Sequence, residues 1–191
     1  MTDAFQPYDC GVFLSKHLSL GTSVFQNAKA VYLSSASSEN GQGSERVIPS
    51  PLNIGIENSR RFRALPVYAS LAAYGSQGYQ DMLLRQIRLA REIARFIELS
   101  DDFELLPQVP HEISIEERLK SVYMIVLFRA RNKTVNDSIV QRMNGTRQLY
   151  VTGTKWEGRP AARFAIANWM VDPEPDLEMV KDVLRGSVKQ G

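Results

Sequence analysis

The fold is decided by the stretch Asn58-Ser59-Arg60-Arg61-Phe62-Arg63-Ala64-Leu65-Pro66. Ser59 has a hydroxyl that can accept a hydrogen bond from the free backbone N–H groups of a first helical turn, as an N-cap does. The apolar residues that follow recur at the spacing of one helix face, at Phe62, Leu65, Tyr68 or Ala69, and Ala72. We therefore predict a helix over residues 59–74 that bends near Ala64, because Pro66 costs roughly 3 kcal/mol inside a helix.

Three arginines, Arg60, Arg61 and Arg63, lie in the first turn of this predicted helix. The helix macrodipole gives an N-terminus partial positive charge, which disfavours cations there, so a negative group is expected nearby. Carboxylates of the same fold would meet this need by forming salt bridges. Alternatively, the free N–H groups, the Ser59 hydroxyl and some of the guanidiniums form a binding corner for a phosphate or a carboxylate.

A second helix is predicted over residues 79–99, after a break at Gly75 and Gly78. Its apolar residues share one face, which consists of Tyr79, Leu83, Ile87, Ala90, Ile93 or Ala94, and Ile97. The opposite face carries a run of charged residues, Arg85, Arg88, Arg91, Glu92 and Arg95. Such a face suits RNA, but it is more often solvated or salt-bridged, and we favour that structural interpretation.

Apolar runs alternate with turn residues in the rest of the chain. They predict strands and helices in the order strand 103–106, strand 121–129, helix 135–144, strands 148–154 and 161–169, and helix 176–188. Residues 155–160 have hairpin chemistry, and Gly145 is of the type that ends a helix in the left-handed conformation. This order predicts a two-layer α+β domain with helices on one face of an antiparallel sheet.

The part of the chain before Asn58 is less regular. A short buried strand is predicted over residues 10–15 and one or two helical turns over residues 18–25. Residues 34–44 read SSASSENGQGS, a composition that buries too little apolar surface to offset its ordering entropy. A mobile loop is expected there, either as a neutral surface insertion or as a functional segment.

Composition excludes several classes of function. The 191 residues are 43% hydrophobic and 23% charged with a net charge of +2, as in ordinary globular proteins, so neither a nucleic acid nor an acidic membrane is expected as a partner. We expect no secretory signal, because Asp3, Gln6 and Asp9 interrupt the first residues, and no membrane span, because no apolar run approaches the roughly 20 residues that cross a bilayer. The single cysteine, Cys10, fits a buried position in a reducing compartment, and we expect a cytoplasmic protein. His17 and His111 have no partner at metal-ligand spacing, so no metal site is expected.

Residues 58–67 resemble the segment that follows the mobile loop in the pyridoxal-phosphate-dependent group II decarboxylases, which act on aromatic amino acids, tyrosine, glutamate or diaminobutyrate. Residues 7–12, PYDCGV, are similar to the strand that follows the family's cofactor-binding lysine. Three later stretches follow the family's C-terminal domain, residues 122–129, 141–166 and 176–184. The resemblance covers nearly the whole chain and is closest to the fungal members, which have Ser50-Pro51-Leu52-Asn53 before the arginines.

The resemblance implies an α/β to α+β fold, namely the C-terminal part of a fold-type I enzyme with long helices and a small two-layer α+β domain built on an antiparallel sheet. Residues 1–100 would be a remnant of the large cofactor-binding domain, with a strand, the mobile loop 34–50 and two helices. Residues 101–191 would be the small C-terminal domain.

The resemblance also implies decarboxylation of an L-amino acid with pyridoxal phosphate as the cofactor. Ser59, and after it Asn58, match positions near the cofactor phosphate across a dimer interface. Pro51 stands where the family's mobile loop has a proton-donating tyrosine. The family's Schiff-base lysine has no counterpart ahead of the matching block, because the first lysine of the chain is Lys16. We therefore predict no catalytic residue and no covalently held cofactor on this chain.

Two classes of function follow from the resemblance. The chain is either the C-terminal fragment of an amino acid carboxy-lyase, inactive by itself, or a non-catalytic interaction and dimerisation module derived from that family. The partners implied are an amino acid substrate and either a second copy or a large-domain half. Aromatic, acidic and basic substrates all stay open, as do the roles of Arg60, Arg61 and Arg63.

Overall fold

The computed structural model describes Gly11, Ser59 and residues 14–25, 55–56, 61–110 and 112–189. Tyr8–Leu65 and Pro66–Gly191 fall in two separate compact units. In the former unit, α1 spans Leu18–Phe25, as predicted. The predicted strand 10–15 is not formed at Gly11, Leu14 or Ser15, while its other residues and the loop 34–50 lie outside the described residues.

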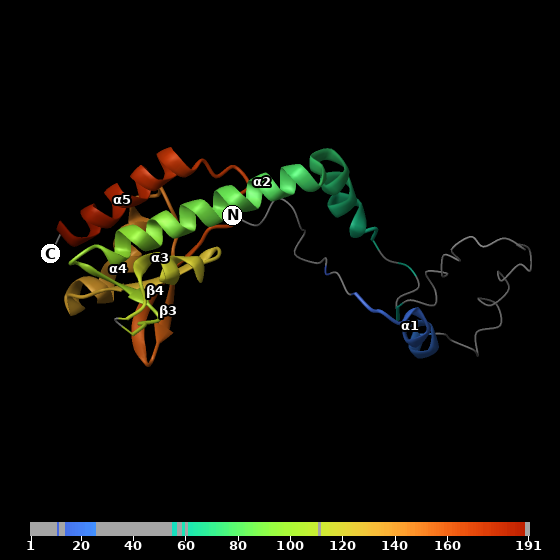
Figure 1. Ribbon diagram of the computed structural model, residues 1–191, viewed down its shortest axis with the longest axis horizontal. Coiled ribbons are helices and arrows are strands. Elements are labelled where there is room, and N and C mark those ends of the chain that lie inside the picture. The colour runs from blue at the N-terminus through green and yellow to red at the C-terminus, as the bar shows by residue number, and fades with distance from the viewer. Residues whose placement is uncertain are drawn as a thin grey trace, which may run out of the picture. The chain divides into compact units, whose positions relative to one another are not determined.

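The latter unit is built on a four-stranded antiparallel sheet in the order β1-β2-β4-β3, of which β3 and β4 are labelled in Figure 1. The strands are β1 Phe103–Leu106, β2 Ile125–Ala130, β3 Thr152–Trp156 and β4 Arg159–Ala165. β3 and β4 form a hairpin with Glu157 and Gly158 at its tip, where φ is 51° and 73°. Two positive φ angles are what a type I′ turn requires. The predicted antiparallel sheet and its hairpin are thus confirmed.

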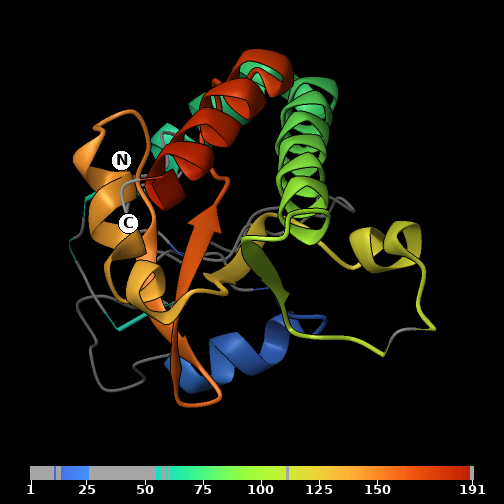
Figure 2. The ribbon, with the colours of Figure 1, turned by 90° about the vertical axis from the view of Figure 1, so that its left-hand side faces the viewer.

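Helices pack on one face of this sheet, and Figure 2 shows α2, α4 and α5 around it. Their bounds are α2 Ala64–Glu98, α4 Lys133–Gly145 and α5 Pro173–Lys189. α4 contacts α5, β2 and β4. Alternate residues of the strands point into the same core, as the two-residue period of a strand dictates, and they are Phe103 and Leu105 of β1, Val126, Phe128 and Ala130 of β2, and Ala162 and Phe164 of β4.

Three aromatic rings lie at the centre of this core. Phe128 is 0% exposed and contacts Phe103 edge-to-face, with ring centroids 5.9 Å apart at 77°. Its ring also stacks on Phe164, with centroids 5.2 Å apart at 16°. Phe128 therefore joins β1, β2 and β4 through direct packing.

The start of α2 differs from the prediction. α2 begins at Ala64, so the predicted helix start with Ser59 as its N-cap is wrong. The physical reason is Pro66, which lacks a backbone N–H and is tolerated in a first helical turn, where that N–H would have no intrahelical partner. The expected bend near Ala64 is instead the helix terminus.

The predicted break near Gly75 is present inside α2. Gly75 has φ 59° and ψ −175°, so it leaves the helical conformation and divides α2 into two helical segments. Gly145 does not take the left-handed conformation predicted for it, because α4 runs through Gly145 and the positive φ of 57° falls on Arg147. A further short helix, α3 Ile115–Lys120, was not predicted.

We expect Gly75→Ala to lower the free energy of unfolding by about 1–3 kcal/mol, because these dihedral angles are accessible almost only to glycine. Gly145→Ala is the matched control, since Gly145 lies in a helix with open space around its Cα, and it is expected to be neutral or stabilising by up to about 1 kcal/mol. Urea unfolding followed by circular dichroism measures both. Equal midpoints for the two variants would contradict a strained backbone at Gly75.

Candidate functional site

The predicted phosphate corner lies ahead of α2. Ser59 is exposed, while Asn58 and Arg60 lie outside the described residues. Past Ser59 the chain makes a tight turn, in which the Arg63 N–H donates to the Arg61 carbonyl at 2.8 Å. Because α2 begins at Ala64, the free N–H groups of its first turn do not share a turn with the Ser59 hydroxyl. Of the predicted phosphate corner, the described residues therefore contain the exposed Ser59 and, two and four positions further on, Arg61 and Arg63.

Lysines decide whether this chain could hold pyridoxal phosphate by itself, because the cofactor's chemistry depends on a lysine that forms a Schiff base. The exposed lysines among the described residues are Lys16, Lys120, Lys133, Lys155 and Lys189. Lys181 is half-buried, with its ammonium 2.7 Å from Glu178 Oε1. That hydrogen bond lowers the pKa of Glu178. None of these described lysines lies in an enclosed site, so the described residues do not by themselves fit the cofactor.

The arginine-rich face of α2 is bonded within the fold. Arg88 forms an ion pair with Glu174 at 2.6 Å, and Arg95 contacts both carboxylate oxygens of Glu116, at 2.6 and 3.1 Å. The hydrogen bond from Arg95 lowers the pKa of Glu116. The remaining two arginines donate to backbone carbonyls, Arg85 to Trp169 and Arg91 to Val122 and Lys120. The predicted salt-bridged face of this helix is therefore confirmed.

Two buried arginines were not singled out from the sequence. Arg118 of α3 has a side chain that is 10% exposed, and it contacts Glu98 Oε1 at 2.5 Å. Its second terminal nitrogen donates to the carbonyls of Leu105 and Pro107, at 2.7 and 2.6 Å.

A sequence signal for α3, the helix that carries Arg118, is Ser114 followed three residues later by Glu117. This spacing is typical of a helix N-terminus, and the Ser114 hydroxyl accepts from the Glu117 N–H at 3.2 Å.

Arg129 is the second buried arginine, with a side chain only 2% exposed on the sheet face opposite the helices. Its Nε lies 3.9 Å from Glu104 Oε2, and its Nη2 donates to the Trp156 carbonyl at 3.5 Å. Nε itself has no hydrogen-bond partner among the described residues. Such long contacts leave part of the charge uncompensated, and a buried charge acts over a longer range than an exposed one.

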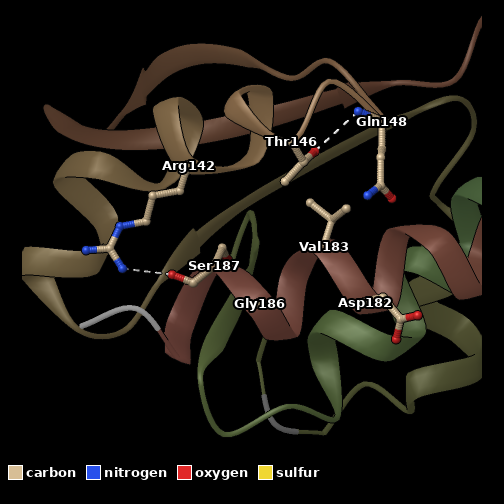
Figure 3. Close-up of a pocket in the computed structure, with 7 residues that line it drawn as sticks. All are labelled: Arg142, Thr146, Gln148, Asp182, Val183, Gly186 and Ser187. Atoms are coloured by element: carbon tan, nitrogen blue, oxygen red, sulfur yellow. Dashed lines mark hydrogen bonds between the residues drawn. The ribbon is translucent and has the colours of Figure 1, made fainter.

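A small cavity lies between α4 and α5, and Figure 3 shows the residues that line it. Its volume is about 160 Å³. Arg142 of α4 lies at one end and donates to the Ser187 carbonyl of α5 at 3.0 Å. The Gln148 N–H donates to the Thr146 hydroxyl at 3.3 Å. Arg142 therefore ties the two helices together, which is a structural role.

The described residues form neither a cluster of metal ligands nor a membrane-spanning helix. In the part of the chain that the structure describes, no group of three or more His, Cys, Asp or Glu side chains gathers to hold a metal ion. His17 is exposed, and His111 lies outside the described residues. None of the described helices combines the length and the hydropathy needed to cross a bilayer.

The fold is that of amino acid decarboxylases. The structure of Catharanthus roseus tryptophan decarboxylase in complex with L-tryptophan superposes with a TM-score of 0.62 at 20% identity, covering 86% of this chain and 32% of that one. This likeness confirms the predicted fold, with long helices and an antiparallel α+β domain.

The relatives found by sequence are amino acid decarboxylases as well. L-2,4-diaminobutyrate decarboxylase of Acinetobacter baumannii is 27% identical over 138 residues, 72% of this chain and 26% of the relative. Aromatic-L-amino-acid decarboxylase of Rattus norvegicus is 22% identical over 166 residues, 86% of this chain and 31% of the relative. No family model matches the chain. The chain thus spans between a quarter and a third of the length of these relatives.

Proposed function

We propose that this chain forms the C-terminal portion of a pyridoxal-phosphate-dependent amino acid decarboxylase, whose Schiff-base lysine lies on another part of the enzyme. The observation that carries this proposal is the similarity to the diaminobutyrate decarboxylase over 72% of the chain. The shared fold supports it. When bound, the cofactor supplies an electron sink for the charge that forms as the carboxyl group leaves.

Ser59 and Asn58 are the residues that we propose to approach the cofactor phosphate, across a dimer interface. The exposed Ser59 side chain supports this role, because a small hydroxyl can donate to a phosphate oxygen without steric conflict. Arg61 and Arg63 would add positive charge near the same group. Pro51, which lies outside the described residues, replaces the loop tyrosine, so the proton donor would have to come from elsewhere in the enzyme.

We expect the 191-residue chain, mixed with pyridoxal phosphate, to release no carbon dioxide from ¹⁴C-carboxyl-labelled 2,4-diaminobutyrate, glutamate or aromatic amino acids. A fusion of this chain behind the preceding part of the Acinetobacter baumannii enzyme is expected to decarboxylate at least one of them. Release at enzymatic rates by the chain alone would overturn the proposal that the lysine lies elsewhere. A folded but inactive fusion would count against decarboxylation itself.

The role of Ser59 has its own variant in that fusion. Ser59→Ala is expected to weaken cofactor affinity roughly five-fold, the equivalent of one hydrogen bond of about 1 kcal/mol. Ser15→Ala is a matched control, since the Ser15 hydroxyl is also exposed but donates to the His17 carbonyl. Equal cofactor affinity of the two variants, measured by equilibrium dialysis, would remove Ser59 from the phosphate site.

The alternative function is a non-catalytic interaction module, and one surface favours it. Tyr68, Leu71 and Tyr74 follow one another at three-residue spacing on the first segment of α2 and are 67%, 52% and 47% exposed. We call these residues the α2 stripe. A short helix that buries little apolar surface gains little stability from its own hydrogen bonds, so a partner that covers the stripe would stabilise it. A second copy or the large domain is the partner that we propose.

Oligomeric state tests this alternative. If the stripe is buried between copies, size-exclusion chromatography with light scattering will give a dimer for the native chain and a monomer for Leu71→Ser. Leu99→Ser is the matched control, because Leu99 is 66% exposed and directly follows the other end of α2. A native monomer that binds no apolar dye would contradict the proposal that the α2 stripe binds a partner. The cytoplasmic location and the nearness to fungal members stay predictions.

A further inference from the structure

The helices that contribute to the core all lie on one face of the sheet. The strand residues that alternate with the core residues point to the opposite face. They are Glu104 and Leu106 of β1, Ile125, Leu127 and Arg129 of β2, Thr152, Thr154 and Trp156 of β3, and Arg159, Ala161, Arg163 and Ala165 of β4. We call these residues the second face.

β2 has the sequence of a strand that is covered on both faces. Its first four residues, 125–128, are all apolar, whereas a strand with one face in water alternates apolar and polar residues. Val126 and Phe128 belong to the core, so Ile125 and Leu127 lie on the second face. Ile125 is nevertheless 45% exposed, and Leu127 is partly exposed. Neighbouring apolar side chains that stay accessible in this way indicate a surface that another part of a protein covers.

The second face also carries excess positive charge. Three arginines of its strands, Arg129, Arg159 and Arg163, accompany one carboxylate, that of Glu104. Arg129 is 2% exposed and lies 3.9 Å from Glu104, with an unpartnered Nε, so its charge is only partly compensated. Neither Arg159 nor Arg163 forms an ion pair with any described residue. Covering uncompensated charges is costly, so a surface that covers this face should supply carboxylates.

Arg163 is the arginine that such a carboxylate can reach near the centre of the sheet. Its side chain is partly exposed, and the residue is directly opposite Leu127 of β2 and Thr152 of β3. Arg129 lies two residues after Leu127 on the same face, so Arg163 and Arg129 are diagonal neighbours. A carboxylate that pairs with Arg163 therefore also offsets the charge of Arg129.

The excess charge distinguishes two kinds of partner. A second copy would pair the second face with itself about a two-fold axis, which sets arginines against arginines. The rest of a longer enzyme has no such constraint. The chain matches 26% and 31% of the length of its relatives, so most of such an enzyme lies outside the matched part.

We propose that the second face docks on the preceding part of the enzyme, which presents carboxylates to Arg163 and Arg129 and apolar side chains to Ile125 and Leu127. This inference rests on the proposed function, because it takes the chain to be the C-terminal portion of a longer enzyme. The surface is separate from the corner around Ser59 and from the α2 stripe.

Cysteine footprinting tests the docking without reading activity. Ala165→Cys places a thiol at an exposed position of the second face, and Gln141→Cys places one at an exposed position of α4, in the helix layer. Maleimide labelling of each site, followed by peptide mass spectrometry, is compared between the 191-residue chain and its fusion behind the preceding part of the Acinetobacter baumannii enzyme. We expect labelling of Ala165→Cys to be about ten-fold slower in the fusion, as for a contact that is closed about nine-tenths of the time. Gln141→Cys is expected to react equally fast in both.

Three results would contradict the docking. One is an equal labelling rate of Ala165→Cys in the chain and in the fusion. Another is protection at Gln141→Cys alone, which would place the contact on the helix layer. The third is protection of Ala165→Cys in the chain alone that grows with its concentration, which would assign the second face to a second copy.

Charge reversal tests whether the cover is acidic. In the fusion, Arg163→Glu is expected to bring labelling of Ala165→Cys to within about two-fold of its rate in the chain alone, because like charges then face each other. Arg163→Gln should give an intermediate rate, and it serves in place of Arg163→Glu if circular dichroism shows that the latter is unfolded. Arg147→Glu is the control, because Arg147 is exposed and follows α4 rather than lying on the second face. Full protection in folded Arg163→Glu or Arg163→Gln would rule out an acidic cover.

The footprint also separates this inference from the proposed function. A fusion that protects Ala165→Cys but releases no carbon dioxide would count against decarboxylation and support the docking. An active fusion in which Ala165→Cys stays accessible would support decarboxylation and contradict the docking.

Discussion

Phe128→Ala is expected to lower the free energy of unfolding by about 3–5 kcal/mol, the range measured when a large buried aromatic is truncated. The Phe128 side chain is fully buried and contacts rings on both neighbouring strands, Phe103 and Phe164. Its removal would forfeit the apolar burial of the ring and both aromatic contacts. Because β2 is hydrogen-bonded to β1 and β4 on its two sides, the sheet can move only slightly to fill the cavity that the substitution would create.

Urea unfolding at equilibrium, followed by far-ultraviolet circular dichroism, measures this loss. Tyr150→Ala is the control, because it also removes an aromatic ring but from a side chain that is 76% exposed, and it is expected to change the stability by less than about 0.5 kcal/mol. Phe128→Leu, which keeps most of the volume, is expected to fall between the two. Similar midpoints for Phe128→Ala and Tyr150→Ala would show that Phe128 is not at the centre of the core.

Arg118→Met is expected to cost about 2–4 kcal/mol, somewhat below the full penalty for breaking a buried ion pair, because Glu98 keeps 24% of its side chain exposed. The substitution keeps the length of the side chain but removes its charge and all its donors. It would leave the Glu98 carboxylate without its partner and the carbonyls of Leu105 and Pro107 without theirs. The bond to the Leu105 carbonyl is part-buried, and an acceptor that loses its partner away from water costs more than the bond contributed, whereas water can replace Arg118 at the exposed bond to Pro107.

Arg88→Met is the matched control for Arg118→Met. Arg88 and Glu174 form an ion pair of similar length, 2.6 Å, but their side chains are 62% and 67% exposed. Water solvates both charges when such a pair is broken, so we expect a loss below about 1 kcal/mol. Thermal and urea unfolding of the two variants at low and moderate salt test the contrast. A larger loss for Arg88→Met than for Arg118→Met would invert the ranking by burial.

Local patterns were sufficient for some elements, whereas the strands predicted over residues 121–129, 148–154 and 161–169 are formed over Ile125–Ala130, Thr152–Trp156 and Arg159–Ala165. The apolar run of β1 and the bounds of α1 agree with prediction at both ends, and the hairpin follows from Glu157-Gly158. The predicted start of α2 at Ser59 was wrong, because the apolar spacing continues back to Phe62 and suggests an earlier helix. Pro66 fits best in the first turn of a helix, and α2 accordingly begins at Ala64. α3 was missed because its six residues are too few for a periodic pattern to register.

Some candidate site residues could be found from one continuous segment of sequence, whereas others are paired only by the fold. Ser59 and Asn58 were found by a resemblance in one continuous segment, and their role at the cofactor stays a prediction. The pair of Arg118 with Glu98 joins residues 20 positions apart, and Arg129 meets Glu104 only because β1 and β2 are in register at these residues. Partners of this kind are set by tertiary packing, so no spacing rule along the chain could have selected them.

The strand order has a consequence for how the protein behaves in a crowded solution. β1 and β3 are the outer strands of the sheet, and the free side of an outer strand can pair with a strand of another molecule. On β1 the Leu105 carbonyl already accepts from Arg118. β1 is only four residues long and is followed at once by Pro107, which has no N–H to offer. β3 is five residues long and carries the charged Lys155 near its end. Pro107 beside β1 and Lys155 in β3 therefore disfavour pairing of these edge strands with strands of neighbouring molecules, which disfavours growth of the sheet into fibrils.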